Sequence, residues 1–150
     1  MEFILWRHAE AENGTPDSAR QLTSKGTDQA ARIAKWLNAK LPAKARIIVS
    51  PAQRAQQTAA ALGRPFLTDE SVGLSATTKS VLAVANWPNE DGVVVIVGHQ
   101  PTLGEIATLL VSYDPMALSF QTGELKWFKS TDEQGAITSV LRHNVYSDML

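Results

Sequence analysis

The chain has 150 residues, of which 44% are hydrophobic, 19% are charged and none is cysteine, and its formal net charge is -1 at pH 7. This size predicts a single domain over residues 1–150, and the lack of cysteine excludes disulfides, thiolate metal sites and cysteine nucleophiles. The scattered Lys and Arg residues argue against binding to nucleic acid or to an anionic membrane, and the absence of any long apolar run argues against a membrane span, so a cytoplasmic location is the simplest expectation.

The first predicted element is a buried strand over the apolar run Phe3–Trp6, which ends at Arg7 and His8. A short apolar run bounded by polar residues is typical of a strand in a parallel sheet that is covered on both faces. Open α/β sheets bind their ligands at the carboxyl ends of the strands, so we expect Arg7 and His8 at a functional surface. The polar loop over residues 11–21 is long enough to form part of the same site.

An amphipathic helix is predicted next, because apolar residues recur at three- and four-residue steps over residues 30–41. Thr23 or Ser24 is the expected N-cap, and Pro42 marks the end of the helix. A second strand follows over residues 46–49.

The second strand leads directly into the pattern of a helix start, with Ser50 as the expected cap, Pro51 at the first position and Gln53 at the third. Arg54 is therefore expected in the first turn of a helix that Gly63 ends. The free N–H groups and the positive dipole end of that turn favour an anion, and an arginine there strengthens the preference.

A short edge strand is predicted over residues 65–68, followed by a polar loop at 69–71 and a third helix over 77–86. The most strongly β-branched run of the chain, residues 93–97, then predicts another buried strand, and it ends at His99. Two buried strands thus each place a histidine at their carboxyl end.

A fourth helix is predicted to begin at Pro101-Thr102 and to break at Asp114-Pro115. Residues 123–128 and 136–141 predict a β-hairpin around a turn at 131–135. Strands alternating with helices and closed by a hairpin indicate an α/β fold, a three-layer α/β/α sandwich with a mostly parallel sheet.

Arg7, His8, Arg54 and His99 all lie at strand ends or in the helix turn after one, so the predicted topology brings them together. Without thiolates or clustered carboxylates they make a poor metal site, and we expect no metal and no cofactor. Two arginines and two imidazoles suit a phosphoryl dianion, with one imidazole as a possible nucleophile.

These residues resemble the histidine phosphatase superfamily, also called phosphoglycerate mutase-like or RHG phosphatases, and within it the SixA-type phosphohistidine phosphatase branch. The resemblance covers four segments in the family's order, residues 3–11, 22–30, 50–59 and 97–101. It implies the phosphoglycerate mutase-like fold and a covalent phosphoryl group carried by His8. It also implies that Arg7, Arg54 and His99 hold the phosphoryl oxygens and that the phospho-enzyme is hydrolysed by water.

The sequence departs from the family at two points. Ala9 stands where the family usually has glycine, which is a variant of the phosphohistidine branch, and the only carboxylates in the region of the family's general acid are Asp69 and Glu70. An imidazole leaving group needs less acid assistance than an alkoxide, so a weak or missing acid favours phosphohistidine over sugar phosphates.

The intervals between the motifs leave no room for a capping insertion, and they predict a shallow, open site. Such a site suits a phosphohistidine on another protein, for example a phosphotransfer domain of a signalling relay, with inorganic phosphate as product. Two alternatives remain. A small-molecule phosphomonoesterase would use Glu70 as acid in a closed pocket, and a catalytically weak phospholigand-binding module would not need the Arg7-His8 pair. Arg20 is expected on the surface, within reach of the pocket.

Overall fold

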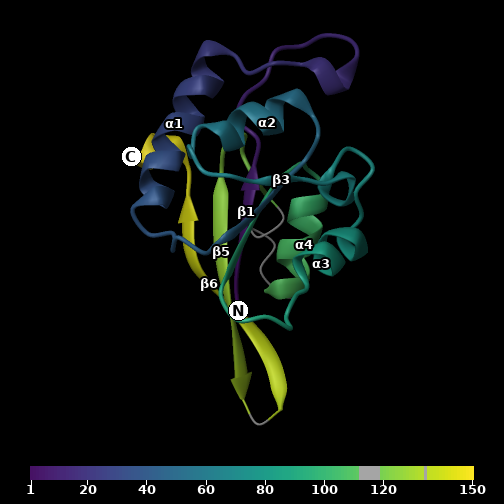
Figure 1. Cartoon of the computed structure of the whole chain (residues 1–150), viewed down its shortest axis with the longest axis vertical. Coiled ribbons are helices and arrows are strands. Elements are labelled where there is room, and N and C mark those ends of the chain that lie inside the picture. Colours follow the sequence, from purple (N-terminus) through teal and green to yellow (C-terminus); the bar gives the residue numbers. More distant parts are fainter. Residues whose placement is uncertain (112–118, 134) are drawn as a thin grey trace.

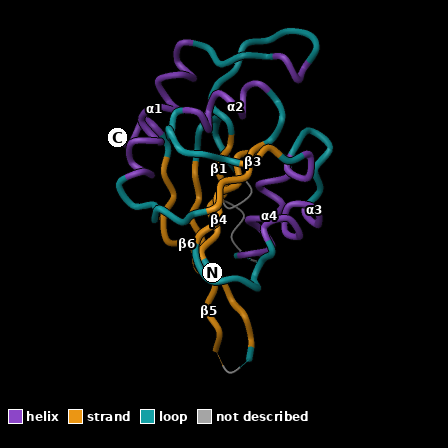
Figure 2. The backbone as a smooth tube through the Cα atoms, in the orientation of Figure 1, coloured by secondary structure: helices purple, strands orange, loops and turns teal. Residues whose placement is uncertain are grey.

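A six-stranded sheet forms the middle layer of the molecule, with helices on both faces (Figure 1, Figure 2). The computed structural model describes residues 1–111, 119–133 and 135–150. The strand order is β3-β2-β4-β1-β5-β6. The strands are β1 (Glu2–Arg7), β2 (Arg46–Val49), β3 (Leu67–Thr68), β4 (Val93–Gly98), β5 (Leu125–Glu133) and β6 (Ala136–Val145).

The first four strands are parallel, whereas β5 is antiparallel to β1 and to β6. This confirms the mostly parallel sheet closed by a hairpin. The hairpin is longer than predicted, and Figure 1 shows it extending beyond the rest of the sheet. The outer residues of the hairpin lack the alternation of apolar and polar residues by which a strand is predicted. They lack it because they do not pack against a core and therefore need no apolar face.

The helices are α1 (Ser24–Asn38), α2 (Gln53–Ala60), α3 (Thr78–Ala85) and α4 (Thr102–Leu110), with short 3-10 turns η1 (Asp17–Ala19), η2 (Glu70–Val72) and η4 (Ser147–Met149). The alternation of side chains along β1 explains the two helical layers. Ile4 and Trp6 pack with α1 and α2, whereas Phe3 and Leu5 pack with α3 and α4 on the other face. All four side chains are fully buried.

Most predicted helix starts are confirmed. Thr23 caps α1 through its hydroxyl, which accepts the Gly26 N–H at 2.9 Å. The prediction that Ser50 caps α2 is wrong, because the helix begins at Gln53 and Ala52 occupies the cap position. Ser50 instead turns its hydroxyl toward His99.

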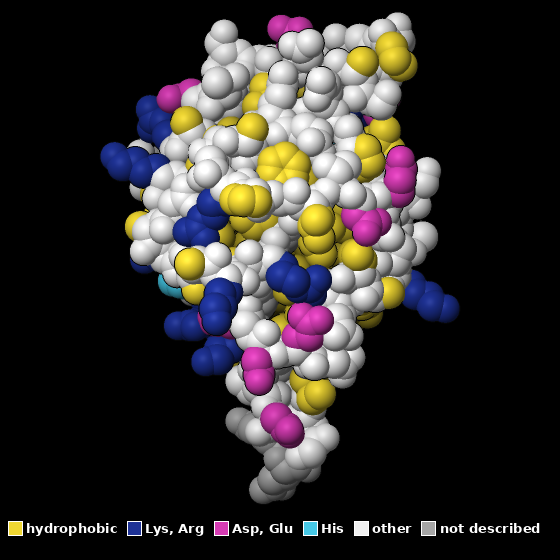
Figure 3. Space-filling view, in the orientation of Figure 1, with side chains coloured by type: hydrophobic (Ala, Val, Ile, Leu, Met, Phe, Trp, Pro, Cys, Tyr) yellow, Lys and Arg dark blue, Asp and Glu magenta, His cyan; other side chains and the backbone are white. Residues whose placement is uncertain are grey.

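The predicted helix break at Asp114-Pro115 lies outside the described residues, as does one residue of the predicted hairpin turn. Over the residues that are described, none of the helices is long and apolar enough to cross a membrane. Positive and negative side chains are interspersed on the face shown in Figure 3, in keeping with the net charge of -1.

Candidate active site

The register of the sheet places the ends of three strands at one level. Arg7 pairs with Gly98 between β1 and β4, and Val49 pairs with Val97 between β2 and β4. His8, Ser50 and His99 therefore leave the same edge of the sheet, and the backbone N–H of His8 still donates to the Gly98 oxygen at 3.1 Å.

His8, Arg54 and His99 meet at this edge, as the sequence predicted. The two imidazole rings lie 5.2 Å apart between centroids, and Arg54 Nε lies 3.3 Å from His8 Nε2. Only 6% of His8, 5% of Arg54 and 8% of His99 is exposed. Asp17 from the 11–21 loop contacts Arg54, and the predicted shallow, open site stays a prediction.

The hydrogen bonds of His8 fix its tautomer. Nδ1 lies 2.8 Å from the Ala9 carbonyl oxygen, which can only accept, so Nδ1 carries the hydrogen. Nε2 then keeps its lone pair and accepts the Nε–H of Arg54. Burial lowers the pKa of His8 to about 3, and the charges of His99, Arg54 and Arg7 also lower it, against the raising effect of the Ala9 bond. His8 is therefore neutral at physiological pH, and its Nε2 carries an unprotonated lone pair.

His99 is assigned the same tautomer as His8, with its hydrogen on Nδ1. Its Nε2 lies 2.7 Å from Ser50 Oγ, and this oxygen already accepts the Ala52 N–H at 3.2 Å. We assign the Ser50 hydroxyl hydrogen to Nε2, the acceptor that lies 2.7 Å away, and this assignment leaves the ring hydrogen of His99 on Nδ1. Burial, followed by the charge of Arg54, lowers the pKa of His99 to about 4, so this ring is also neutral.

Two buried N–H donors have no hydrogen-bond partner within the described residues, and both belong to this site: Arg7 Nε and His99 Nδ1. A different nitrogen of the Arg7 guanidinium, NH1, donates to the Phe120 backbone oxygen at 2.7 Å. Buried polar groups almost always have a partner, so two such donors in one site indicate a ligand that accepts. An oxyanion bound between them would accept from both.

Sequence analysis missed Asp17. This carboxylate lies in η1, where Oδ2 accepts from Arg54 NH2 at 3.1 Å and Oδ1 accepts from Arg20 NH1 at 3.0 Å. Bonds from Arg20, followed by those from Arg54, hold the pKa of Asp17 below its usual range. Only the length of the loop signalled a role for this segment, since a single aspartate in a polar loop has no pattern. Arg20 was expected on the surface. Its side chain is 24% exposed and forms an ion pair with Asp17.

The two predicted acid candidates lie near the site without a recorded bond to its four central residues. Asp69 caps η2 by accepting the Ser71 N–H at 2.8 Å, which holds its pKa low. The exposed Glu70 belongs to the same turn. The turn itself adjoins β4, since a Cβ at Gly98 would stand 3.5 Å from the Val72 oxygen.

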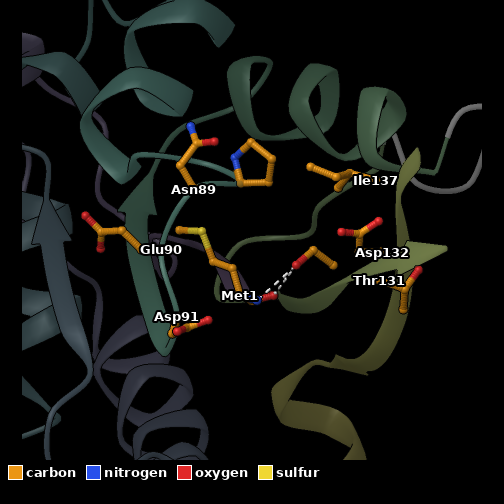
Figure 4. Close-up of a pocket in the computed structure, with 9 residues that line it drawn as sticks. Met1, Asn89, Glu90, Asp91, Thr131, Asp132 and Ile137 are labelled. Carbon is orange, nitrogen blue, oxygen red and sulfur yellow. Dashed lines mark hydrogen bonds between the residues drawn. The ribbon is translucent and has the colours of Figure 1, made fainter. Parts of the chain in front are cut away.

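Within the part of the chain that is described, His, Asp and Glu side chains form no group of three that could hold a metal ion. A separate hollow of about 350 Å³ lies at the other end of the strands, around Met1, Glu90, Asp91 and Asp132. The Met1 amine donates to Ser130 Oγ at 2.9 Å, and Figure 4 shows Met1 among the residues that line this hollow. Its carboxylate lining differs from the arginines and histidines of the candidate site.

Comparison with known proteins places these residues in a family context. Residues 3–72 match the model described as histidine phosphatase superfamily, branch 1. The phosphohistidine phosphatase SixA of Escherichia coli strain K12 is 36% identical over 125 residues, covering 73% of this chain and 74% of that protein.

Solved structures agree on the fold. The protein histidine phosphatase SixA complexed with tungstate gives a TM-score of 0.80 at 23% identity, with 99% of both chains covered. A phosphoserine phosphatase of Entamoeba histolytica, solved with 3-phosphoglyceric acid, gives 0.69 at 18% identity, with 95% of both chains covered. These likenesses confirm the predicted phosphoglycerate mutase-like α/β architecture.

Proposed function

This chain belongs to the histidine phosphatase superfamily and to its SixA-type branch, and from that premise we propose that it hydrolyses phosphohistidine on a partner protein through a covalent phospho-His8 intermediate. The observation that carries the proposal is the pair of unpartnered donors, Arg7 Nε and His99 Nδ1, beside a neutral His8. A phosphatase of this family needs a nucleophile and oxyanion donors in one place, and these residues supply both.

In the first step, the lone pair of His8 Nε2 attacks the phosphorus of phosphohistidine, and the bond from phosphorus to the substrate's ring nitrogen breaks. A substrate ring that is protonated on its other nitrogen leaves as neutral imidazole. His8 becomes a phospho-imidazolium, whose Nδ1–H remains bonded to the Ala9 oxygen. Arg7, Arg54 and His99 face the phosphoryl oxygens, which carry the charge in the transition state.

In the second step, water attacks the phosphorus and the bond to His8 Nε2 breaks. The products are neutral His8, hydrogen phosphate and a proton that is released to solvent. No metal or organic cofactor takes part in this scheme. The low pKa of His8 makes it a good leaving group here, for the same reason that it stays unprotonated in the resting enzyme.

The choice of phosphohistidine over an ester depends on the leaving group. An alkoxide needs a proton from a well-placed acid, whereas a protonated imidazole ring does not. Asp17 is ionised by its two arginine partners and cannot serve as that acid near neutral pH. Asp69 is engaged with Ser71, so the acids around the site favour a phosphoramidate substrate.

A second candidate, the hydrolysis of small phosphomonoesters, is favoured by the position of η2. The Glu70 carboxylate lies on the side of η2 toward Gly73, since a Cβ at Gly73 would stand 3.5 Å from Glu70 Oε2 and 3.2 Å from Pro51 Cδ. Pro51 directly follows Ser50, the partner of His99. Glu70 would then be the acid that protonates the leaving oxygen of an ester.

The test compares a phosphorylated phosphotransfer domain with a panel of small phosphomonoesters, using wild type, His8→Ala and Glu70→Gln. His143→Ala is the matched control, because His143 lies on β6 against Trp36 and Trp127 rather than in the site. We expect rapid loss of protein phosphohistidine that needs His8 and neither His143 nor Glu70. Faster hydrolysis of a small ester, lost in Glu70→Gln, would instead establish the second candidate.

A further inference from the structure

One residue, Asp17, holds both terminal nitrogens of Arg54, one through its backbone and one through its carboxylate. Its NH1 donates to the Asp17 backbone oxygen at 2.8 Å, and its NH2 donates to Asp17 Oδ2 at 3.1 Å. The third nitrogen of the same guanidinium, Nε, faces His8 Nε2 at 3.3 Å. Asp17 and His8 therefore lie on different edges of one planar group.

A guanidinium is flat and its N–H groups form a fixed fork, so bonds to two of its nitrogens determine its plane and rotation. Arg54 has its backbone in α2 and ends in a nearly closed space, with 6% of its side chain exposed, whereas Asp17 is 56% exposed. The bonds to Asp17 thus leave the Nε edge of Arg54 directed at His8, where the phosphoryl group must arrive.

Asp17 is itself held by a second arginine. Arg20 NH1 donates to Oδ1, the oxygen that Arg54 does not use, and Arg20 Nε donates to the Glu12 oxygen at 2.6 Å. Arg20 also offsets the negative charge that Asp17 would otherwise place near a phosphoryl dianion. The contacts form a continuous series from Glu12 through Arg20, Asp17 and Arg54 to His8.

We propose that Asp17, braced by Arg20, is a positioning residue that fixes Arg54 in the orientation in which its Nε edge binds the phosphoryl group transferred to His8. Asp17 acts on the anion through Arg54 rather than by touching it. The inference rests on the proposed function for the identity of the transferred group, while the binding geometry applies to any tetrahedral oxyanion at this site.

Tungstate binding measured by calorimetry tests the inference without requiring turnover. The variants are Asp17→Ala, Arg54→Gln and their combination, and Asp28→Ala is the control because it removes an exposed ion pair, with Arg32. We expect Asp17→Ala to weaken tungstate binding about tenfold and to add less than about twofold in the Arg54→Gln background, since coupled residues are not additive. Asp17→Asn, which keeps an acceptor oxygen, should restore part of the affinity.

Two results would overturn the inference. Tighter tungstate binding by Asp17→Ala means that Asp17 competes with the anion for Arg54, and equal weakening in both backgrounds means that Asp17 only supports the loop. Thermal melts of every variant identify folding defects, and Arg54→Lys replaces Arg54→Gln if the latter does not fold. Normal coupling in a protein that fails to hydrolyse phosphohistidine would refute the proposed substrate alone.

Discussion

Arg54 donates its Nε–H to His8 Nε2 across 3.3 Å, so a permanently charged group holds the lone pair of the proposed nucleophile. Protonation of His8 on Nε2 would remove the acceptor of this hydrogen bond and would place a second positive charge beside Arg54. The same guanidinium would bind the phosphoryl group that His8 attacks. Arg54 thus keeps Nε2 unprotonated in the resting site, and a phosphoryl oxygen must replace Nε2 as the acceptor of this N–H before His8 can attack.

The first prediction concerns the titration of the two histidines. His8 and His99 have pKa values of about 3 and about 4, against 6.5 for a free histidine, chiefly because both are buried. Their ring C–H resonances in the nuclear magnetic resonance spectrum of the free enzyme should therefore not shift until the pH falls well below 6. A midpoint near 6.5 for either ring would contradict the account.

The same pKa values determine how stability changes with pH. A folded-state pKa below the unfolded value means that the unfolded chain binds more protons in between, so the free energy of unfolding falls as the pH falls from about 6.5 toward about 4. Urea melts of wild type and His8→Gln at about pH 7.5 and about pH 4.5 measure this term. The variant should lose less stability on acidification, and an equal loss would be inconsistent with a buried neutral His8.

The second prediction concerns Ser50, which holds His99 by its Nε2 at 2.7 Å. Ser50→Ala should reduce kcat for phosphohistidine hydrolysis on the order of tenfold, the cost of one lost hydrogen bond to a buried group. Nitrogen-15 spectra should also show His99 changing from the pure Nδ1–H form to a mixture of tautomers. Unchanged spectra and activity would exclude this role, and Ser24→Ala at an exposed position is the control.

The third prediction concerns Arg7, whose NH1 donates to the Phe120 oxygen and whose Nε has no partner among the residues that the structure describes. Arg7→Lys keeps the charge but loses the Nε donor, so kcat should fall on the order of 10²-fold. Arg32→Lys, at an exposed position, should leave the rate unchanged. If Arg7→Lys retained full activity, the positive charge at this position would be sufficient for catalysis, and the Nε–H of Arg7 would have no role in it.

The fourth prediction concerns the contact between α1 and the segment after His8. A Cβ at Gly26 would stand 2.0 Å from the Glu10 backbone oxygen, so Gly26→Ala must displace one of them. We expect a loss of about 3 kcal/mol in the free energy of unfolding, at the upper end for overpacking. Lys25→Ala in the same turn is the control, and chemical denaturation makes the comparison. If Gly26→Ala lost no more unfolding free energy than Lys25→Ala, the segment around Glu10 would be able to move aside without cost.

The sequence was sufficient for the layers and for the central cluster because both depend on strong local signals. Buried β-branched strands with a histidine at the end place His8 and His99 at one edge of a parallel sheet, and the helix start after Val49 places Arg54 beside them. The family resemblance reached the same residues independently.

Other features depend on contacts between distant segments, which carry no local pattern. Asp17 contacts Arg54 only once the loop has folded against α2. The Ser50 hydroxyl bonds to His99, which lies 49 positions further along the chain, instead of capping the helix. The predicted shallow site followed from the absence of an insertion, and it stays a prediction. The carboxylates Asp69 and Glu70 remain a prediction, since their role depends on a substrate.

The most direct measurement of the central claim follows the phosphoryl group itself. A phosphotransfer domain labelled on its phosphohistidine is mixed with the enzyme in a single turnover and quenched under alkaline conditions, and the labelled peptide is mapped. The account predicts transient label on His8 in the wild type and in His143→Ala, and none in His8→Ala, which should also fail to release phosphate. Release of phosphate at an undiminished rate by His8→Ala, or label on another residue, would contradict it.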